Sequence, residues 1–313
     1  MGSPLLDFPV SMESTAVGDA TKTRASGARA IPDMPLPLNS LRLVDADVDL
    51  RFGAVKLGEG AALGPLLVRA VIDDGRVKAE PVQLSVKPDR ALNMSGSIDA
   101  VQGAWTLRVE GKGIDFGELL ARLGHAAVVT GGNTELGIRL QGRGKSLAAI
   151  LGSLHGEARL TVGPYHIRNF AVNIEGGIIP RLFALANPFH KTDPDTEVKC
   201  FVVSVPVSNG ILSSERNIAL ETAKYNVVAS GTLNLRTERM DVALTPVVRG
   251  EARTLVRVGG TLAAPEVGLD AAGAARSAAS LGAAVVMPAW LIADSLIRKA
   301  ASDPNPCATA LAR

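Results

Sequence analysis

Apolar and polar residues alternate with a period of two along most of this chain. The clearest run is residues 44–52, in which apolar residues at the even positions alternate with three aspartates and Arg51 at the odd positions. Successive side chains of a β-strand point to opposite faces, so this period is typical of a half-buried strand. Residues 44–52 are therefore predicted to form a strand with one apolar face and one acidic face.

The next run, residues 68–79, predicts a hairpin. It is interrupted by Asp74-Gly75, a pair that favours the tight turn between antiparallel strands. After Pro81 the apolar residues move from odd to even positions, which indicates a β-bulge or an edge position. Further alternating runs occur at residues 82–86, 107–109, 136–140, 158–162, 170–174, 201–205, 218–220, 233–235, 240–244 and 256–258. About a dozen strands joined by short connections indicate a mainly β, antiparallel fold.

Three short segments have helical spacing instead: residues 116–123, 147–154 and 178–185. The first two each follow an alternating strand and a Gly-x-Gly sequence, and Asp115 and Ser146 are placed to cap them. This weak repeat of about 30 residues favours an elongated stack of units over a closed barrel.

The two ends of the chain lack the alternation. Residues 1–37 mix small and polar residues with prolines, which predicts a disordered leader and a folded part that begins near Leu38. Residues 274–300 are rich in aliphatic residues around Pro288, which predicts one kinked helix or two short ones. Three placements are open for this segment: against the end of the sheet, at a membrane surface, or across a membrane.

Composition narrows the class of protein. Hydrophobic residues make up 47% of the 313 residues and aromatic residues only 4%, so aliphatic side chains must supply most of the buried surface. The net charge of +2 argues against a protein that binds nucleic acid. The first thirty residues contain acidic residues and no continuous apolar stretch, so we expect no secretion signal or membrane anchor in this chain.

No motif predicts an enzyme. Gly142–Ser146 resembles the end of a phosphate-binding loop, but Arg139 occupies the position of the first required glycine. The four histidines lack metal-ligand spacing, and the aspartates of residues 45–49 would project from one strand face without wrapping an ion. The sequence also lacks the Gly-x-Ser-x-Gly motif of common hydrolases. We therefore expect a non-enzymatic protein with no catalytic residues, no metal ion and no cofactor.

The sequence contains two cysteines, Cys200 and Cys307. Two cysteines fit either a reducing or an oxidising compartment. If they pair, the disulfide joins the tail of the chain to the strand that contains Cys200. If they do not, they are two unrelated thiols, and the sequence leaves both alternatives open.

The segment from Val198 to Asp270 carries a more specific signal. Gly231-Thr232-Leu233-Asn234-Leu235-Arg236-Thr237-Glu238 is followed by Gly260-Thr261-Leu262-Ala263-Ala264-Pro265. This order resembles the C-terminal module of the AsmA family of bacterial envelope proteins, whose distant relatives include TamB, and similar spacing covers roughly residues 36–310. The predicted organisation is a leader at 1–37, a β-groove with short helical inserts at 38–197, the AsmA-like β module at 198–270, and a helical C-terminal cap and tail at 271–313.

The resemblance implies both a fold and a function. AsmA-like proteins have a long antiparallel sheet curled into a hydrophobic groove, lie in the periplasm and are anchored in the inner membrane by an N-terminal helix, a segment that we do not expect in this sequence. They support outer-membrane biogenesis by conducting phospholipids or by influencing outer-membrane protein assembly. The family has no catalytic residues, so the resemblance assigns none to this sequence. The expected partners are therefore phospholipids, envelope membranes and outer-membrane assembly proteins.

The apolar faces of the predicted strands form one surface that three or four short helices cannot cover. Either the sheet folds on itself as a sandwich or rolled tube, or its apolar face is an open groove that holds acyl chains. For the groove, the predicted lining residues are Val48, Leu50, Ile72, Leu84, Leu107, Ile138, Leu160, Val203, Leu233 and Val242. The alternative function is a non-enzymatic scaffold that targets or assembles outer-membrane proteins through exposed strand edges.

Overall fold

The computed structural model describes residues 5–8, 29–57, 63–122, 129–168, 195–223, 225–248, 251–252, 256–269 and 303–312. Strands account for most of them. The longer strands are β2 (Ala46–Phe52), β4 (Leu66–Asp73), β5 (Arg76–Lys87), β6 (Arg90–Asp99), β7 (Ala104–Asp115), β9 (Asn133–Arg143), β10 (His155–Val162), β12 (Asp195–Ser208), β13 (Ile211–Thr222), β14 (Tyr225–Asn234), β15 (Arg239–Val248), β17 (Val256–Gly260) and β18 (Pro265–Leu269). The shorter strands are β1 (Leu5–Phe8), β3 (Ala54–Leu57), β8 (Val129–Gly131), β11 (Tyr165–Arg168) and β16 (Glu251–Ala252).

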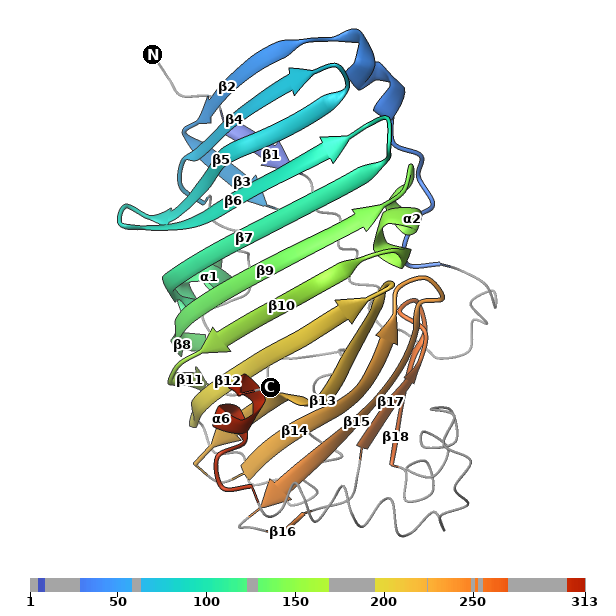
Figure 1. Cartoon of the computed structure of the whole chain (residues 1–313). Coiled ribbons are helices and arrows are strands. Elements are labelled where there is room, and N and C mark those ends of the chain that lie inside the picture. The colour runs from blue at the N-terminus through green and yellow to red at the C-terminus, as the bar shows by residue number, and fades with distance from the viewer. Residues whose placement is uncertain are drawn as a thin grey trace, which may run out of the picture.

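Sixteen of these strands form one open, twisted sheet (Figure 1). Its main path follows the chain almost in order, from β2 at one edge through β4, β5, β6, β7, β9, β10, β12, β13, β14, β15 and β17 to β18 at the other. Neighbours along this path are antiparallel, and β1 and β3 form a separate parallel pair. The predicted mainly β architecture, an elongated antiparallel sheet with short helices, is confirmed.

The first hairpin shows why the sequence pattern was informative. Asp74 and Gly75 connect β4 to β5 with φ angles of 43° and 73°, the left-handed conformation that a two-residue hairpin turn requires. Further along β5, the pairing register shifts between Ala79 and Val82. The bulge that the Pro81 parity change predicted lies at this shift, and it keeps the apolar residues of β5 on one face.

The described residues also contain three α-helices and one 3-10 helix: α1 (Phe116–Arg122), α2 (Leu147–Gly152), α6 (Pro306–Leu311) and η1 (Leu38–Leu43). Both predicted caps are present. The N–H of Glu118 donates to Asp115 Oδ1 at 2.8 Å, and the N–H of Ala149 donates to Ser146 Oγ at 3.3 Å. The helices predicted at 178–185 and 274–300 and the strand predicted at 170–174 lie outside the described residues.

The predicted start of the folded chain needs correction. Residues 29–43, here called the rim segment, run along the ends of the strands, where the sequence predicted a disordered leader up to residue 37 (Figure 1). The N–H of Ala30 donates to Glu238 Oε2 at 2.6 Å, and the N–H of Leu36 donates to the Lys145 carbonyl at 2.9 Å. The contact with Glu238 spans 208 residues, so local composition could not reveal it.

Glu238 makes the rim segment sensitive to pH. Its side chain is only 4% exposed, and its Oε1 lies 2.8 Å from Arg29 Nε. The Arg29 hydrogen bond, followed by the N–H groups of Ala30 and Ile31, holds the pKa of Glu238 below its usual value, although loss of solvent opposes the shift. A folded-state pKa below the unfolded value means that the carboxylate stabilises the fold above the unfolded pKa, and that this contribution disappears as the pH falls through the folded pKa.

We therefore expect Glu238→Gln to lower the free energy of unfolding at pH 7 by about 1 to 2 kcal/mol, because it removes a charged hydrogen-bond acceptor. The difference from the wild type should shrink at an acid pH below the folded-state pKa of Glu238, where the wild-type carboxyl group is also protonated. Thermal unfolding of both proteins at the two pH values measures this, with the exposed Glu197→Gln as the matched control. An equal difference at both pH values would show that the charge of Glu238 is not what secures the rim segment.

Candidate functional site

The pairing register assigns every strand residue to one of two faces. Directly paired residues of neighbouring strands point to the same face of a sheet. A single row of such pairs crosses the sheet from β2 to β15, and it is aliphatic or glycine at every position. The row runs Val48, Ala70, Ala79, Gly96, Leu107, Leu140, Gly156, Val207, Leu212, Leu233 and Met240. We call the face that contains this row the inner face and the opposite one the outer face.

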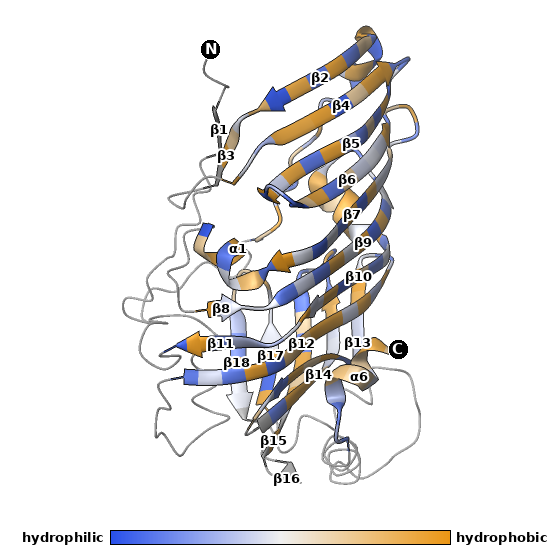
Figure 2. Ribbon diagram, turned by 90° about the vertical axis from the view of Figure 1, so that its left-hand side faces the viewer, coloured by the Kyte–Doolittle hydropathy of each residue, from blue (hydrophilic) through white to orange (hydrophobic). Residues whose placement is uncertain are grey.

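All ten predicted groove residues lie on the inner face. Val48, Leu107 and Leu233 belong to the row itself. The other seven are joined to inner-face partners by the same registers: Leu50 to Val68, Ile72 to Val77, Leu84 to Leu92, Ile138 to Val109, Leu160 to Leu136, Val203 to Leu160, and Val242 to Val258. The sheet curls toward this face, so that α1, β8, β11, β17 and β18 lie on its inner side and α6 on its outer side (Figure 2).

The inner face is only partly covered. None of the ten groove residues is buried, and Leu50 and Leu107 expose 44% and 45% of their surface. Aliphatic side chains in the core of a sheet are normally buried, so a contiguous row of half-exposed ones calls for a partner. A sandwich or a tightly rolled tube would have buried them, and in the described part of the chain the inner face between Leu50 on β2 and Leu107 on β7 instead stays partly open.

A packed cluster limits this surface on one side. Val162, Tyr165 and Val198 are at most 5% exposed and pack against Phe116 at the start of α1. The Phe116 and Tyr165 rings meet edge to face with centroids 5.6 Å apart. β8 and β11 extend the lines of β9 and β10 past a bend and close over the inner face here. We call these residues the inner cluster, and sequence reasoning missed it because it depends on how strands bend.

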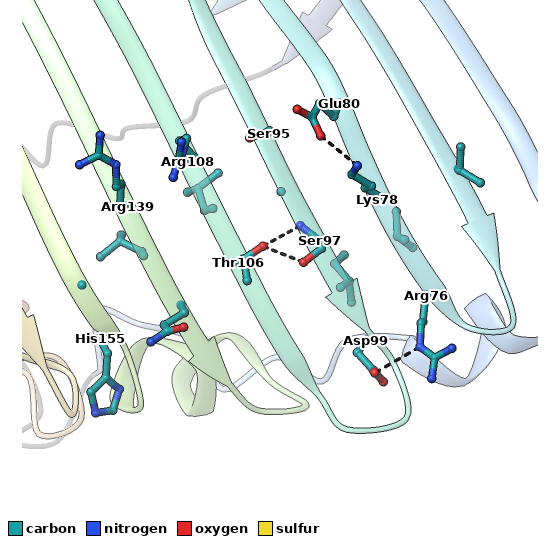
Figure 3. A pocket seen from close by; sticks show the side chains of 18 of the residues that line it. Arg76, Lys78, Glu80, Ser95, Ser97, Asp99, Thr106, Arg108, Arg139 and His155 are labelled. Carbon is teal, nitrogen blue, oxygen red and sulfur yellow. Dashed lines mark hydrogen bonds and ion pairs between the residues drawn. The ribbon is translucent and has the colours of Figure 1, made fainter.

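The outer face is polar, and its charges are largely paired. Figure 3 shows a shallow hollow over β5 to β10 in which Arg76 lies 3.5 Å from Asp99 and Lys78 lies 3.2 Å from Glu80. Arg139 contacts a glutamate on each neighbouring strand. Paired, solvated side chains of this kind are typical of a sheet surface in water.

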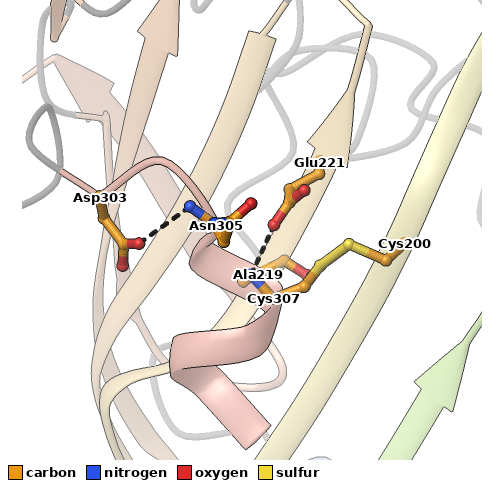
Figure 4. The surroundings of a disulfide bond; sticks show 6 residues. All are labelled: Cys200, Ala219, Glu221, Asp303, Asn305 and Cys307. Atoms are coloured by element: carbon orange, nitrogen blue, oxygen red, sulfur yellow. Dashed lines mark hydrogen bonds between the residues drawn. A yellow bond between two sulfur atoms is a disulfide. The ribbon is translucent and has the colours of Figure 1, made fainter.

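The C-terminal helix is attached to the outer face. Cys200 on β12 and Cys307 on α6 form a disulfide with an S–S distance of 2.01 Å (Figure 4). The N–H of Cys307 donates to Glu221 Oε1 at 2.8 Å, and Cys307 packs against the buried Val202 and Ala219. The sequence left open whether the two cysteines pair, and in the structure they form a disulfide.

Among the described residues, one set of three His, Cys, Asp or Glu side chains lies close enough together to hold a metal ion. It consists of Cys200, Glu221 and Cys307. The two sulfur atoms of this set bond to each other, so only the Glu221 carboxylate is left to bind an ion.

An ion pair is a second attachment of the tail, and sequence reasoning missed it. Arg216 and Asp303 lie 2.9 Å apart, and both side chains are at most 15% exposed.

Comparison with known proteins agrees with the motif around Gly231–Glu238. The chain is 22% identical over 286 residues to the AsmA family protein YhjG from Escherichia coli (strain K12), a match that covers 87% of this chain. The chain is thus similar to an AsmA family protein along most of its length. It spans 40% of the length of that AsmA relative. No family model and no solved structure gives a match. Within the described residues, no helix is long and apolar enough to cross a membrane.

Proposed function

We propose that this protein belongs to the AsmA family, binds phospholipid acyl chains along its inner face and in this way supports outer-membrane biogenesis in the bacterial envelope. The observation that carries the proposal is the row of aliphatic residues from Val48 to Met240, whose open part between β2 and β7 includes the half-exposed Leu107. Similarity to an AsmA family protein favours an envelope role. The proposed action is binding and conduction, with no bond made or broken.

Desolvation supplies the driving force in this proposal. Each methylene group that leaves water for an apolar surface contributes about 0.8 kcal/mol, so an acyl chain gains most from a long continuous surface. The inner-face row crosses eleven strands without a charged residue. A surface of this kind distinguishes chain length and shape rather than head group, so we expect low selectivity among phospholipids.

Photo-crosslinking tests the proposal at neighbouring residues of opposite faces. A photoreactive residue at Leu50 or Ile138 on the inner face should form phospholipid adducts in cells. The matched controls are Asp49 and Arg139, which are adjacent in sequence and point to the outer face. Adducts as frequent at the controls as at the inner positions would overturn lipid binding by the inner face.

A charge on the inner face separates this function from that of an interaction scaffold. Leu107→Asp, on the interior strand β7, should reduce the phospholipid that copurifies with the protein, and because Leu107 is 45% exposed the fold should tolerate the change. A scaffold that acts through strand edges should retain its protein partners in the same variant. Unchanged lipid together with lost partners would contradict the lipid proposal.

A further inference from the structure

Among the described residues, the strand β2 forms one edge of the large sheet. Among the described residues it pairs only with β4, through seven consecutive residue pairs without a register shift. Natural edge strands are usually blocked by a proline, a bulge, a charge that points inward, or outward charges that repel a partner strand, most often lysines. β2 contains no proline or lysine, and its inward residues are Ala46, Val48, Leu50 and Phe52. The opposite edge strand β18 has only five residues, begins at a proline and includes a glycine.

We propose that β2 pairs antiparallel with β2 of a second copy of this chain. The apolar residues of β2 have even numbers and its charged residues odd numbers. The apolar residues of the two strands therefore share a face only if even-numbered residues are opposite even-numbered ones. One such register pairs all seven residues of both strands. It places Ala46 opposite Phe52, Asp47 opposite Arg51, Val48 opposite Leu50, and Asp49 opposite Asp49 of the other copy.

Charge complementarity favours a copy of the same strand as the partner. The register forms two Asp47–Arg51 pairs across the new interface, and opposite charges on directly paired residues stabilise a sheet. The Asp49–Asp49 contact at the centre is offset because each Asp49 already accepts hydrogen bonds from Arg51 and Arg69 at 3.1 Å and 3.2 Å. These two arginines keep the pKa of Asp49 below its usual value, Arg51 having the larger effect.

Neighbouring registers are less favourable. A shift of two residues in one direction places Asp47 opposite Asp49 twice. A shift in the other direction leaves only five residue pairs, so two residues at the start of each strand lose their partners. The full seven-residue register is therefore the one that the sequence of β2 supports.

The proposed dimer has a structural consequence for the inner face. The two-fold axis that relates antiparallel strands of one sheet is perpendicular to the sheet, so both inner faces lie on the same side. The aliphatic surface of one copy then continues into the surface of the other through Val48 and Leu50. This geometry does not depend on what the inner face binds, so its test is separate from the lipid test.

Cysteine crosslinking tests the register. Both native cysteines are joined in a disulfide, so one substitution introduces one free thiol. Asp49→Cys should give a covalent dimer on mild oxidation, because directly paired residues have β-carbons about 4.5 to 5.5 Å apart. Asp47→Cys and Arg51→Cys should each stay monomeric on denaturing gels, since their thiols are about four residues apart along the strands, but a mixture of the two variants should crosslink.

A second measurement uses the full chain without crosslinking. The wild type should be a dimer by light scattering, and Val48→Lys should be a monomer because it places a charge on the inward side of the edge. Val71→Lys is the matched control, since Val71 lies on the outer face of β4 and is 49% exposed, and it should remain a dimer with the same circular dichroism. A monomeric wild type would overturn the proposal, also if β2 then bound a different protein. Crosslinking that is equal at positions 47, 49 and 51 would overturn it as well.

Discussion

Replacement of Gly156 by alanine is expected to destabilise the protein by about 3 kcal/mol or more, enough to lower the unfolding temperature by several degrees. Gly156 has a φ of +136°, and a β-carbon at this position would lie 2.0 Å from the Arg139 carbonyl oxygen. The residue is paired with Leu140 on one side and Val207 on the other. The backbone therefore cannot move away without breaking two strand pairings, and the substitution combines conformational strain with a steric clash.

Gly137→Ala is the matched control for this prediction. Gly137 lies on the neighbouring strand β9, and a β-carbon there would have no heavy atom within 4 Å. We expect a change within about 0.5 kcal/mol, since nothing has to shift and a side chain reduces the entropy of the unfolded chain. Chemical denaturation of both variants measures the difference, and equal stability of the two would show that the close approach of β9 and β10 at Gly156 is relaxed in solution.

Much of the sheet could be predicted from the sequence because the side-chain period of a strand is two. Once one residue of a strand is assigned to the apolar face, every second residue follows, and this placed Leu50, Ile138 and Val242 on one surface. The turn at Asp74-Gly75 and the caps at Asp115 and Ser146 were predictable for a similar reason, since each depends on neighbours within a few residues.

The features that the sequence did not reveal depend on contacts between distant residues. The rim segment is folded because Glu238, more than 200 residues away, accepts hydrogen bonds from Ala30 and Ile31. The inner cluster forms because β8 and β11 bend over the inner face near Phe116. Alternation predicts that a face is apolar but carries no information on which part of that face the chain itself covers. The open part of the candidate site therefore became visible only through the exposure of residues such as Leu107.

Loss of the disulfide between Cys200 and Cys307 is also expected to destabilise the protein strongly. Its cysteines are separated by 107 residues, and a crosslink across a loop of this length stabilises the folded state by about 4 to 5 kcal/mol in the chain-entropy model. Packing adds to this value, because α6 is placed so that Ala310 is fully buried against Ala219 and Val202. Much of this packing would be lost if α6 were released from the outer face.

We expect the Cys200→Ser/Cys307→Ser double variant to lose about 4 kcal/mol of unfolding free energy, and the wild type to lose a similar amount when it is treated with a thiol reductant. Denaturant titrations with and without reductant measure both effects, and the double variant serves as the control because reductant should leave its unfolding curve unchanged. The remaining Arg216–Asp303 ion pair, with both side chains at most 15% exposed, is expected to keep part of the tail on the outer face. If the reduced wild type unfolded at the same denaturant concentration as the oxidised protein, the crosslink would not stabilise the sheet.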